Sequence, residues 1–230
     1  MKIAQCWDDG VVNDIRLAEL FRKYNAKATF NLNPGFMKDE RIPDSWLPAG
    51  AKEWAANGYR GGKVGKKELL EVYKGFEVAS HCWCHETVGY VDDDKFTKAA
   101  IDARLFLEDV FQRPCHGFAW PCGAFTPETC DRLREAGFEY GRTTKSTDDP
   151  LAYDDPMQLH SHCHFQDPWF YDKYEKAKAA GCKFFYFWGH SYEMYTYDKF
   201  WEQFEMKLKY ISDDKDAQWA NVIDIVREPR

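Results

Sequence analysis

The sequence lacks long hydrophobic runs, clusters of basic residues, repeats and low-complexity segments. No stretch approaches the roughly 18 consecutive apolar residues of a membrane span, and the mean hydropathy is −0.65, which argues against residence in a membrane. The 31 Lys and Arg residues are outnumbered by 38 Asp and Glu residues, and the net charge of −7 argues against nucleic-acid binding. Without linkers or repeats, the chain is expected to form one domain that spans residues 1–230.

A signal-peptide core is also missing at the start, because two carboxylates, Asp8 and Asp9, arrive before one could form. We therefore expect a cytoplasmic protein, or a secreted one whose leader has been removed. The eight cysteines fit the cytoplasmic alternative, since most of them lie in apolar runs, as buried reduced thiols do. Aromatic residues, in contrast, make up 17% of the chain, an excess that is compatible with a cleft lined by rings.

Short apolar runs alternate with amphipathic stretches along the chain. We predict seven β-strands, at Lys2–Cys6, Lys27–Leu32, Phe76–His81, His116–Trp120, Phe138–Thr143, Met157–His162 and Lys183–Trp188. Residues 34–66, rich in Pro, Gly and Trp, are predicted to form a long excursion. Strands that alternate with helices indicate a parallel sheet. If the sheet closes into a barrel, the loops after the strands share one face, where such folds carry their chemistry.

Polar residues follow the ends of the predicted strands, where that face would lie. In chain order they are Asp8, Asp9, His81, His85, Cys122, Arg142 and His190. Residues far apart in the sequence are therefore expected to share one rim.

The Asp8-Asp9-Gly10 sequence has two interpretations. An Asp-Gly pair is a common turn signal, so the segment is compatible with a plain turn. Adjacent carboxylates that leave a strand point to different sides, however. One of them can then bind a metal ion while its neighbour acts as a base on the same water.

His81 and His85 would lie on one face of a helical turn, which suits the binding of one metal ion. Two other interpretations are solvated histidines on a surface turn and a structural zinc site that uses Cys82 and Cys84. A structural site needs four ligands, and a second cysteine pair at suitable spacing is absent from the sequence. With Asp9, the two histidines give three ligands and an open position for water, as in hydrolytic metal centres.

His190 directly follows an aromatic, apolar strand. One side of its ring should be desolvated, which holds the imidazole pKa near the range useful for proton transfer. The alternative is a core histidine bonded to a backbone carbonyl.

Three further histidines, His160, His162 and His164, alternate along one predicted strand and would share one of its faces. They could also bind a metal ion, but no carboxylate stands beside them at ligand spacing. We interpret them as residues that line the substrate or support the site, with a purely structural role as the alternative.

Four motifs, in this order, resemble those of the polysaccharide deacetylases, which form carbohydrate esterase family four. They are Asp8-Asp9-Gly10, the His81 and His85 pair, the segment from Phe118 to Gly123, and Trp188-Gly189-His190. The family includes chitin, peptidoglycan and acetylxylan deacetylases, and the resemblance covers residues 1 to about 195. It implies a distorted (β/α)7 barrel, similar to a TIM barrel. It also implies a metal-dependent hydrolase that removes acetyl groups from an N-acetylated carbohydrate, with an O-acetylated one as the second choice.

The resemblance also assigns roles to residues. Asp8 would be the general base and His190 the general acid, and a divalent metal ion, most often zinc, would be held by Asp9, His81 and His85. The backbone N–H of Cys122 would help to stabilise the oxyanion. The substrate, a carbohydrate or a small amide, is expected to contact Trp120, Trp188 and Tyr192.

Four residues of the family's pattern are missing from this sequence, among them a tyrosine where Cys122 stands and a tryptophan that, with an acidic residue, tunes the acid histidine. The arginine that usually orients the base is absent, and Arg142 is the candidate to replace it from a neighbouring loop. The acidic residue that tunes the acid histidine is not recognisable.

Two other functions remain open. One is an amidohydrolase of the allantoinase or cyclic-imidase type, in which Arg142 would bind an anionic ureide. The other is a non-catalytic, metal-stabilised barrel that binds carbohydrate. The retention of both Asp8 and His190 counts against the second, because binding alone needs neither a base nor an acid.

Overall fold

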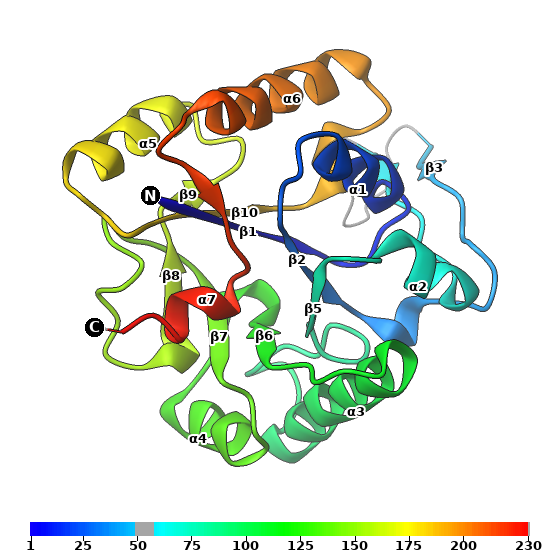
Figure 1. The fold of residues 1–230 in the computed structure, drawn as a ribbon. Helices are drawn as coiled ribbons and strands as arrows, with labels where there is room; N and C mark the ends of the chain where they lie inside the picture. The colour runs from blue at the N-terminus through cyan, green and yellow to red at the C-terminus, as the bar shows by residue number, and fades with distance from the viewer. Residues whose placement is uncertain (49–57, 230) are drawn as a thin grey trace.

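A curved sheet of parallel strands forms the centre of the molecule, and helices surround it (Figure 1). The computed structural model describes residues 1–48 and 58–229. The strands follow the order β8-β7-β6-β5-β2-β1-β10-β9, and β11 pairs with the start of β1. Their bounds are β1 Lys2–Asp8, β2 Thr29–Leu32, β5 Glu77–Ser80, β6 Gly117–Ala119, β7 Tyr140–Ser146, β8 Leu159–Ser161, β9 Cys163–His164, β10 Phe184–Gly189 and β11 Gln218–Trp219.

The α-helices in the described ranges are α1 Asp14–Lys23, α2 Leu69–Val72, α3 Asp93–Phe111, α4 Pro127–Glu135, α5 Phe170–Ala179, α6 Asp198–Asp213 and α7 Ile223–Val226. Local sequence explains where the longer ones begin. The side chain of Asp92 caps α3 by accepting a hydrogen bond from the Lys95 N–H, and Thr126 caps α4 in the same way, with Pro127 at the first position. None of the helices in this part of the chain is both long and apolar enough to cross a membrane.

The two edges of the sheet are consecutive in the chain. β8 ends at Ser161 and β9 begins at Cys163, so only His162 separates two strands that stand at opposite ends of the strand order. The sheet therefore curves round until its edges approach each other, which gives a distorted (β/α)7 barrel. The expected fold class is confirmed, and each of the seven predicted strands overlaps an observed one.

The strands that sequence analysis missed in the described ranges are two residues long. They are β9, β11 and the antiparallel hairpin of β3, Ser45–Trp46, and β4, Tyr59–Arg60. Two residues are too few to produce a detectable alternation of polar and apolar side chains. The hairpin lies in the expected excursion at residues 34–66, of which residues 49–57 fall outside the described part.

The C-terminal segment closes the N-terminal end of the barrel, where α7 lies over its centre (Figure 1). The Ala220 N–H donates to the Ile3 carbonyl at the start of β1, and the Ile223 N–H donates to Glu77 at the start of β5. Ile225 is fully buried in the core that these contacts enclose. The polar residues that follow the strands therefore gather at the opposite, C-terminal end.

Candidate active site

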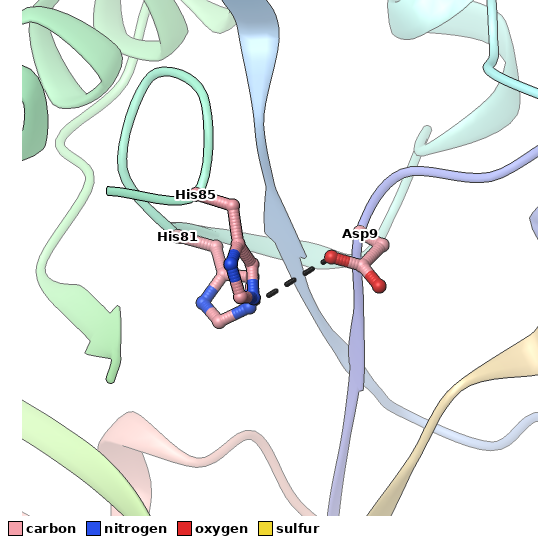
Figure 2. A group of neighbouring side chains, drawn as sticks. All are labelled: Asp9, His81 and His85. Atoms are coloured by element: carbon pink, nitrogen blue, oxygen red, sulfur yellow. Dashed lines mark ion pairs between the residues drawn. The ribbon is translucent and has the colours of Figure 1, made fainter. Parts of the chain in front are cut away.

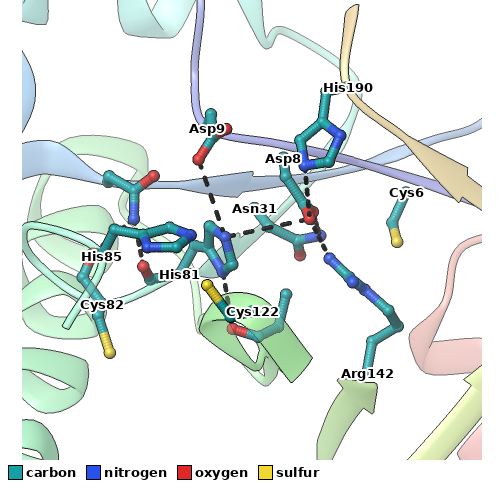
Figure 3. A network of polar contacts seen from close by, with 12 residues as sticks. Cys6, Asp8, Asp9, Asn31, His81, Cys82, His85, Cys122, Arg142 and His190 are labelled. Atoms are coloured by element: carbon teal, nitrogen blue, oxygen red, sulfur yellow. Dashed lines mark hydrogen bonds and ion pairs between the residues drawn. The ribbon is translucent and has the colours of Figure 1, made fainter. Parts of the chain in front are cut away.

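The two aspartates at the end of β1 have different surroundings (Figure 3). Asp8 is the last residue of the strand, and its side chain is only 2% exposed. Asp9 has a left-handed backbone with a φ of 84°, a conformation that costs free energy in a residue other than glycine. The Asp9 N–H donates to the Asn31 carbonyl, and the Lys63 ammonium donates to the Asp9 carbonyl at 2.7 Å. Hydrogen bonds to both its N–H and its carbonyl therefore fix the strained backbone of Asp9.

Asp8 is held by a buried amide and a buried guanidinium. Asn31 Nδ2 donates to Oδ1 of Asp8 at 2.7 Å, and Arg142 donates to Oδ2. Burial alone would raise the pKa of Asp8, but Arg142, His81 and His190 outweigh it and hold the pKa well below its ordinary value. Asp8 is therefore ionised at neutral pH. Arg142 contacts Asp8, as expected of a substitute for the missing arginine, but it lies within β7 and not in a neighbouring loop.

The two histidines after β5 converge without a helical turn, so the helical turn expected here was wrong. Cys82 and His85 have left-handed backbones, with φ of 60° and 57°. The side-chain amide of Asn33 donates to the carbonyls of His81 and Cys82, so these groups are occupied by a side chain rather than by helical N–H groups. The turn still brings the imidazoles together, with 4.7 Å between ring centroids and 87° between planes.

Asp9, His81 and His85 form a group that could hold a metal ion, because their ligand atoms all lie within 4.8 Å of one another (Figure 2). The Ala119 carbonyl lies 2.8 Å from His81 Nδ1, which assigns the ring hydrogen to Nδ1 and leaves the Nε2 lone pair for a ligand. Nε2 faces Asp9 Oδ1 at 3.8 Å. Burial lowers the pKa of His81 to about 4, so the ring is neutral, as a metal ligand must be.

The carboxylate of Asp9 is better placed as a metal ligand than that of Asp8. Both oxygens of Asp8 accept hydrogen bonds, whereas no hydrogen bond engages the Asp9 carboxylate within the described ranges. The donor set is the carboxylate of Asp9 and the imidazoles of His81 and His85, with the lone pair of His81 on Nε2. Such a set fits a divalent ion such as zinc.

His190 directly follows β10 and faces Asp8 (Figure 3). Its Nε2 lies 3.8 Å from Asp8 Oδ2, and its Nδ1 lies 3.2 Å from Glu193 Oε2. Burial alone would lower the pKa of His190, but Glu193, Asp8 and Asp9 together raise it above its ordinary value. The ring can therefore hold a proton beside Asp8 near neutral pH.

Glu193 is one of the residues of this site that sequence reasoning missed. Its Oε2 also accepts from the His190 N–H at 3.1 Å, at the start of the turn Ser191–Met194. The capping-box signature has Ser, Thr, Asp or Asn at its first position, whereas His190 stands there, so the sequence carried no recognisable signal for Glu193. Lys63 gave no signal either, because it lies in the excursion before α2.

The residues expected to contact substrate divide into two groups. Trp120 is fully buried, stacks on Phe96 and donates its indole N–H to the Met157 carbonyl, so its expected contact with substrate was wrong. Trp188 and Tyr192 lie beside the His190 ring, with centroid distances of 5.4 and 4.9 Å. Both positions remain available for a substrate contact.

Cys122 lies in the turn Pro121–Gly123 that follows β6 (Figure 3). Its backbone is left-handed, with a φ of 55°. This turn adjoins the strand whose last residue, Ala119, contacts His81. The backbone of Cys122 is therefore on the same rim as the histidines, as the motif order suggested.

The three alternating histidines do not come together as one group. His160 Nδ1 lies 2.6 Å from the Thr143 hydroxyl, and His162 Nδ1 accepts from the Tyr186 N–H at 3.1 Å. His164 contacts Glu193 instead, with 2.9 Å between Nε2 and Oε2. A bend between β8 and β9 breaks the alternation on which a shared strand face depended.

A family model described as polysaccharide deacetylase matches residues 1–141. A search of curated proteins gives no match. Among solved structures, the chain is similar to a family 4 carbohydrate esterase from Bacillus anthracis, with a TM-score of 0.62 and 14% identity over 98% of this chain and 82% of that one. It is also similar to a family 4 acetyl xylan esterase from Clostridium thermocellum in complex with a cobalt ion, with a TM-score of 0.57 and 13% identity over 99% of this chain and 91% of that one.

A further similar structure is a CE4 family pseudoenzyme from Bacillus anthracis, with a TM-score of 0.57 and 15% identity over 98% of this chain. The chain spans 65% of that protein. It spans 55% of a deacetylase from Streptococcus pyogenes, which matches 61% of this chain at 20% identity with a TM-score of 0.49. At these identities the structural likenesses show the fold alone.

Proposed function

Because the chain belongs to the polysaccharide deacetylase family, we propose that it removes acetyl groups from a carbohydrate with the help of a divalent metal ion, zinc in the first instance. We propose an N-acetylated sugar as substrate ahead of an O-acetylated one. The observation that carries the proposal is the arrangement at one end of the barrel. There, the ionised Asp8 and the histidine with a raised pKa, His190, face each other beside the metal-type group, our name for the three possible metal ligands Asp9, His81 and His85.

Each residue can perform one part of the hydrolysis. An ion bound by Asp9, His81 and His85 would supply Lewis acidity to the acyl oxygen and lower the pKa of a water. Asp8, kept ionised by Arg142, accepts the proton of the attacking water. His190 holds a proton on Nε2 for the leaving amine, which would otherwise depart as an unfavourable anion. The backbone N–H of Cys122 donates to the developing oxyanion.

The alternative of an allantoinase-type enzyme loses its main support. Arg142 was the candidate to bind an anionic ureide, but its side chain is 1% exposed and donates to Asp8. A guanidinium that neutralises a buried carboxylate is not free to bind a second anion. The non-catalytic alternative is decided by the experiment below.

The test compares the metal content of the wild-type protein with that of His85→Ala, using His116→Ala as a matched control. His116 lies at the other end of β6 and pairs with Glu139 at 2.7 Å. We expect one divalent ion per wild-type chain, its loss from His85→Ala and its retention in His116→Ala. A stoichiometric metal content in His85→Ala would contradict the ligand set.

The same proteins are then assayed for acetate release from N-acetylated chitooligosaccharides and from acetylated xylan. We expect release from the first substrate, and about 10²-fold or greater loss in His85→Ala, since the chemistry depends on the ion. A wild-type protein that binds metal and sugar without releasing acetate from either substrate would favour the non-catalytic alternative.

A further inference from the structure

The carboxylate of Glu193 lies between two histidines from different strands. His190 follows β10 and His164 ends β9, and the nearer nitrogen of each lies 3.2 and 2.9 Å from the same oxygen, Glu193 Oε2. The His190 N–H also donates to this oxygen at 3.1 Å. Three N–H groups are therefore directed at one atom, and the carboxylate fixes the position of His190 relative to β9.

The hydrogen-bond pattern decides which nitrogen of His164 carries its hydrogen. The backbone N–H of Gln166 donates to His164 Nδ1 at 3.3 Å, so Nδ1 is the acceptor of the neutral ring. The hydrogen is then on Nε2, which donates to Glu193. His81 shows the opposite pattern, because its Nδ1 faces a carbonyl oxygen and its Nε2 keeps the lone pair.

This difference bears on whether a second metal ion belongs here. His164, His190 and Glu193 lie close enough together to hold one. Coordination through His164 Nε2, however, would require the ring to give up its hydrogen on that atom while Nδ1 still faces a donor. The geometry therefore favours His164 as a hydrogen-bond donor over His164 as a metal ligand.

We propose that His164 is a positioning residue that acts on the acid histidine, His190, through Glu193. The inference rests on the proposed function and assigns a new residue to it. The Glu193 side chain has three rotatable bonds and is 23% exposed, so water competes for its oxygens. His164 holds the carboxylate in place from β9, and the side-chain amide of Gln166 donates to the Glu193 carbonyl at 3.2 Å. With Nδ1 of His190 bonded to that carboxylate, its Nε2 points toward Asp8.

The leaving group gives this role a specific signature. An amine needs the proton that His190 delivers, whereas the anion released from an activated acetate ester hardly needs it. A displaced His190 should therefore slow hydrolysis of an N-acetyl sugar much more than hydrolysis of an activated ester. A general loss of structure would slow both alike.

The test compares His164→Leu with His164→Gln, since the glutamine amide can present an N–H near the position of Nε2. His160→Leu is the matched control, because His160 bonds to Thr143 rather than to the site. We expect His164→Leu to lower kcat for the N-acetyl sugar about tenfold or more while sparing the activated ester, at unchanged metal content. His164→Gln should recover most of the loss, and His160→Leu should match the wild type. Equal losses on both substrates, or two metal ions per wild-type chain and one in His164→Leu, would overturn the proposal.

A second readout is independent of activity. The ¹⁵N chemical shifts of the neutral His190 ring should place its hydrogen on Nδ1 in the wild type and in His164→Gln, and show a mixture of tautomers in His164→Leu. An unchanged tautomer in His164→Leu would overturn the positioning role, whether or not the wild type releases acetate. A changed tautomer in a protein that releases no acetate would support the positioning role and contradict the proposed deacetylase function alone.

Discussion

Asp8 and Arg142 are buried charges, with side chains that are 2% and 1% exposed. Taking each charge out of water costs several kcal/mol, and their attraction offsets this cost only while both are present. Arg142 Nε is also a buried donor without a partner within the described ranges. A pair of apolar residues would serve stability as well or better. We therefore interpret the pair as one that is kept for the chemistry of Asp8.

The first prediction concerns the substitution of Asp8 by asparagine. The amide keeps the shape of the side chain but cannot accept a proton, so acetate release should fall about 10²–10⁴-fold. The metal content should not change, because Asp9, His81 and His85 are untouched. The free energy of unfolding should fall by about 3–5 kcal/mol, since Arg142 is left without a counter-charge. Metal analysis, acetate assays and urea denaturation measure the three effects.

The double variant Asp8→Asn/Arg142→Met separates chemistry from stability. Methionine fills much of the space of the arginine without its charge, so the double variant should recover most of the lost stability. Activity should stay at the level of Asp8→Asn. Loss of the metal from Asp8→Asn would instead mean that the roles of Asp8 and Asp9 must be exchanged.

At the level of secondary-structure elements, the site is built from turns that directly follow strands. Four of its residues, Asp9, Cys82, His85 and Cys122, have positive φ values between 55° and 84°. Each such residue is strained by about 1–2 kcal/mol. The left-handed residues bend the chain just after β1, β5 and β6 and aim side chains and N–H groups at one another. Strain of this kind is concentrated where the functional side chains meet.

Sequence reasoning predicted the strand ends but not these turns. Parallel strands bring their C-terminal ends together, so the meeting of Asp8, His81 and His190 followed from the strand pattern alone. The backbone of the turns was hidden because aspartate, cysteine and histidine carry no signal for positive φ comparable to that of glycine. The helical turn expected at His81 and His85 was therefore wrong, although the two rings do meet.

The error at Trp120 has a different physical origin. Neighbouring side chains of a strand point to opposite faces of the sheet. Because Phe118, Ala119 and Trp120 are all apolar, the sequence does not indicate which of them points toward the site. The Ala119 carbonyl contacts His81 of the site, while the ring of Trp120 stacks on Phe96 of α3. A tryptophan near a strand end is often a core residue, because its large apolar surface favours burial.

The second prediction concerns Glu77, a buried residue that links three elements at the N-terminal end of the barrel. It begins β5 and accepts hydrogen bonds from Thr29 of β2, Tyr140 of β7 and the Ile223 N–H of α7. Burial raises its pKa from 4.5 to about 6, with Asp224 adding to the shift. The folded state therefore binds this proton more tightly than the unfolded chain. The stability it contributes is present below pH 4.5 and is lost as the pH rises through about 6.

Glu77→Gln removes the titration while keeping an acceptor oxygen. The quantity to follow is the difference in unfolding free energy between the wild type and this variant. As the pH rises from 4.5 to 7.5, the wild type should lose about 1–2 kcal/mol relative to the variant. Urea denaturation across this range measures it. Asp14, with a pKa raised to about 7, titrates in both proteins and cancels in the difference. Parallel pH profiles for the two proteins would contradict the assignment to Glu77.

At the level of the whole molecule, the candidate site draws its residues from both halves of the chain. The family model matches residues 1–141, which carry the aspartates and the metal-type group. His164 on β9, and His190 and Glu193 just after β10, come from the remainder. β10 pairs with β1, and β9 pairs with β10. The chain end then returns to the N-terminal end of the barrel, where Lys2 pairs with Glu228 at 2.5 Å. The barrel thus has one end that is plugged by apolar residues and one that carries the candidate site.

The third prediction tests whether these two ends are independent. Ile225 is fully buried in the core that plugs the barrel, so Ile225→Ala should lower the free energy of unfolding by about 2–4 kcal/mol. Its neighbour Val226 is only partly buried, and Val226→Ala should cost less than about 1 kcal/mol. Both variants should keep the metal content and acetate release of the wild type, because the metal-type group lies beyond the opposite ends of the strands. Loss of the metal from folded Ile225→Ala would show that the plug also sets the geometry of the rim. The C-terminal segment contacts β1, β2 and β5. Of these strands, β1 ends at Asp8, β2 carries Asn31 and β5 is directly followed by His81.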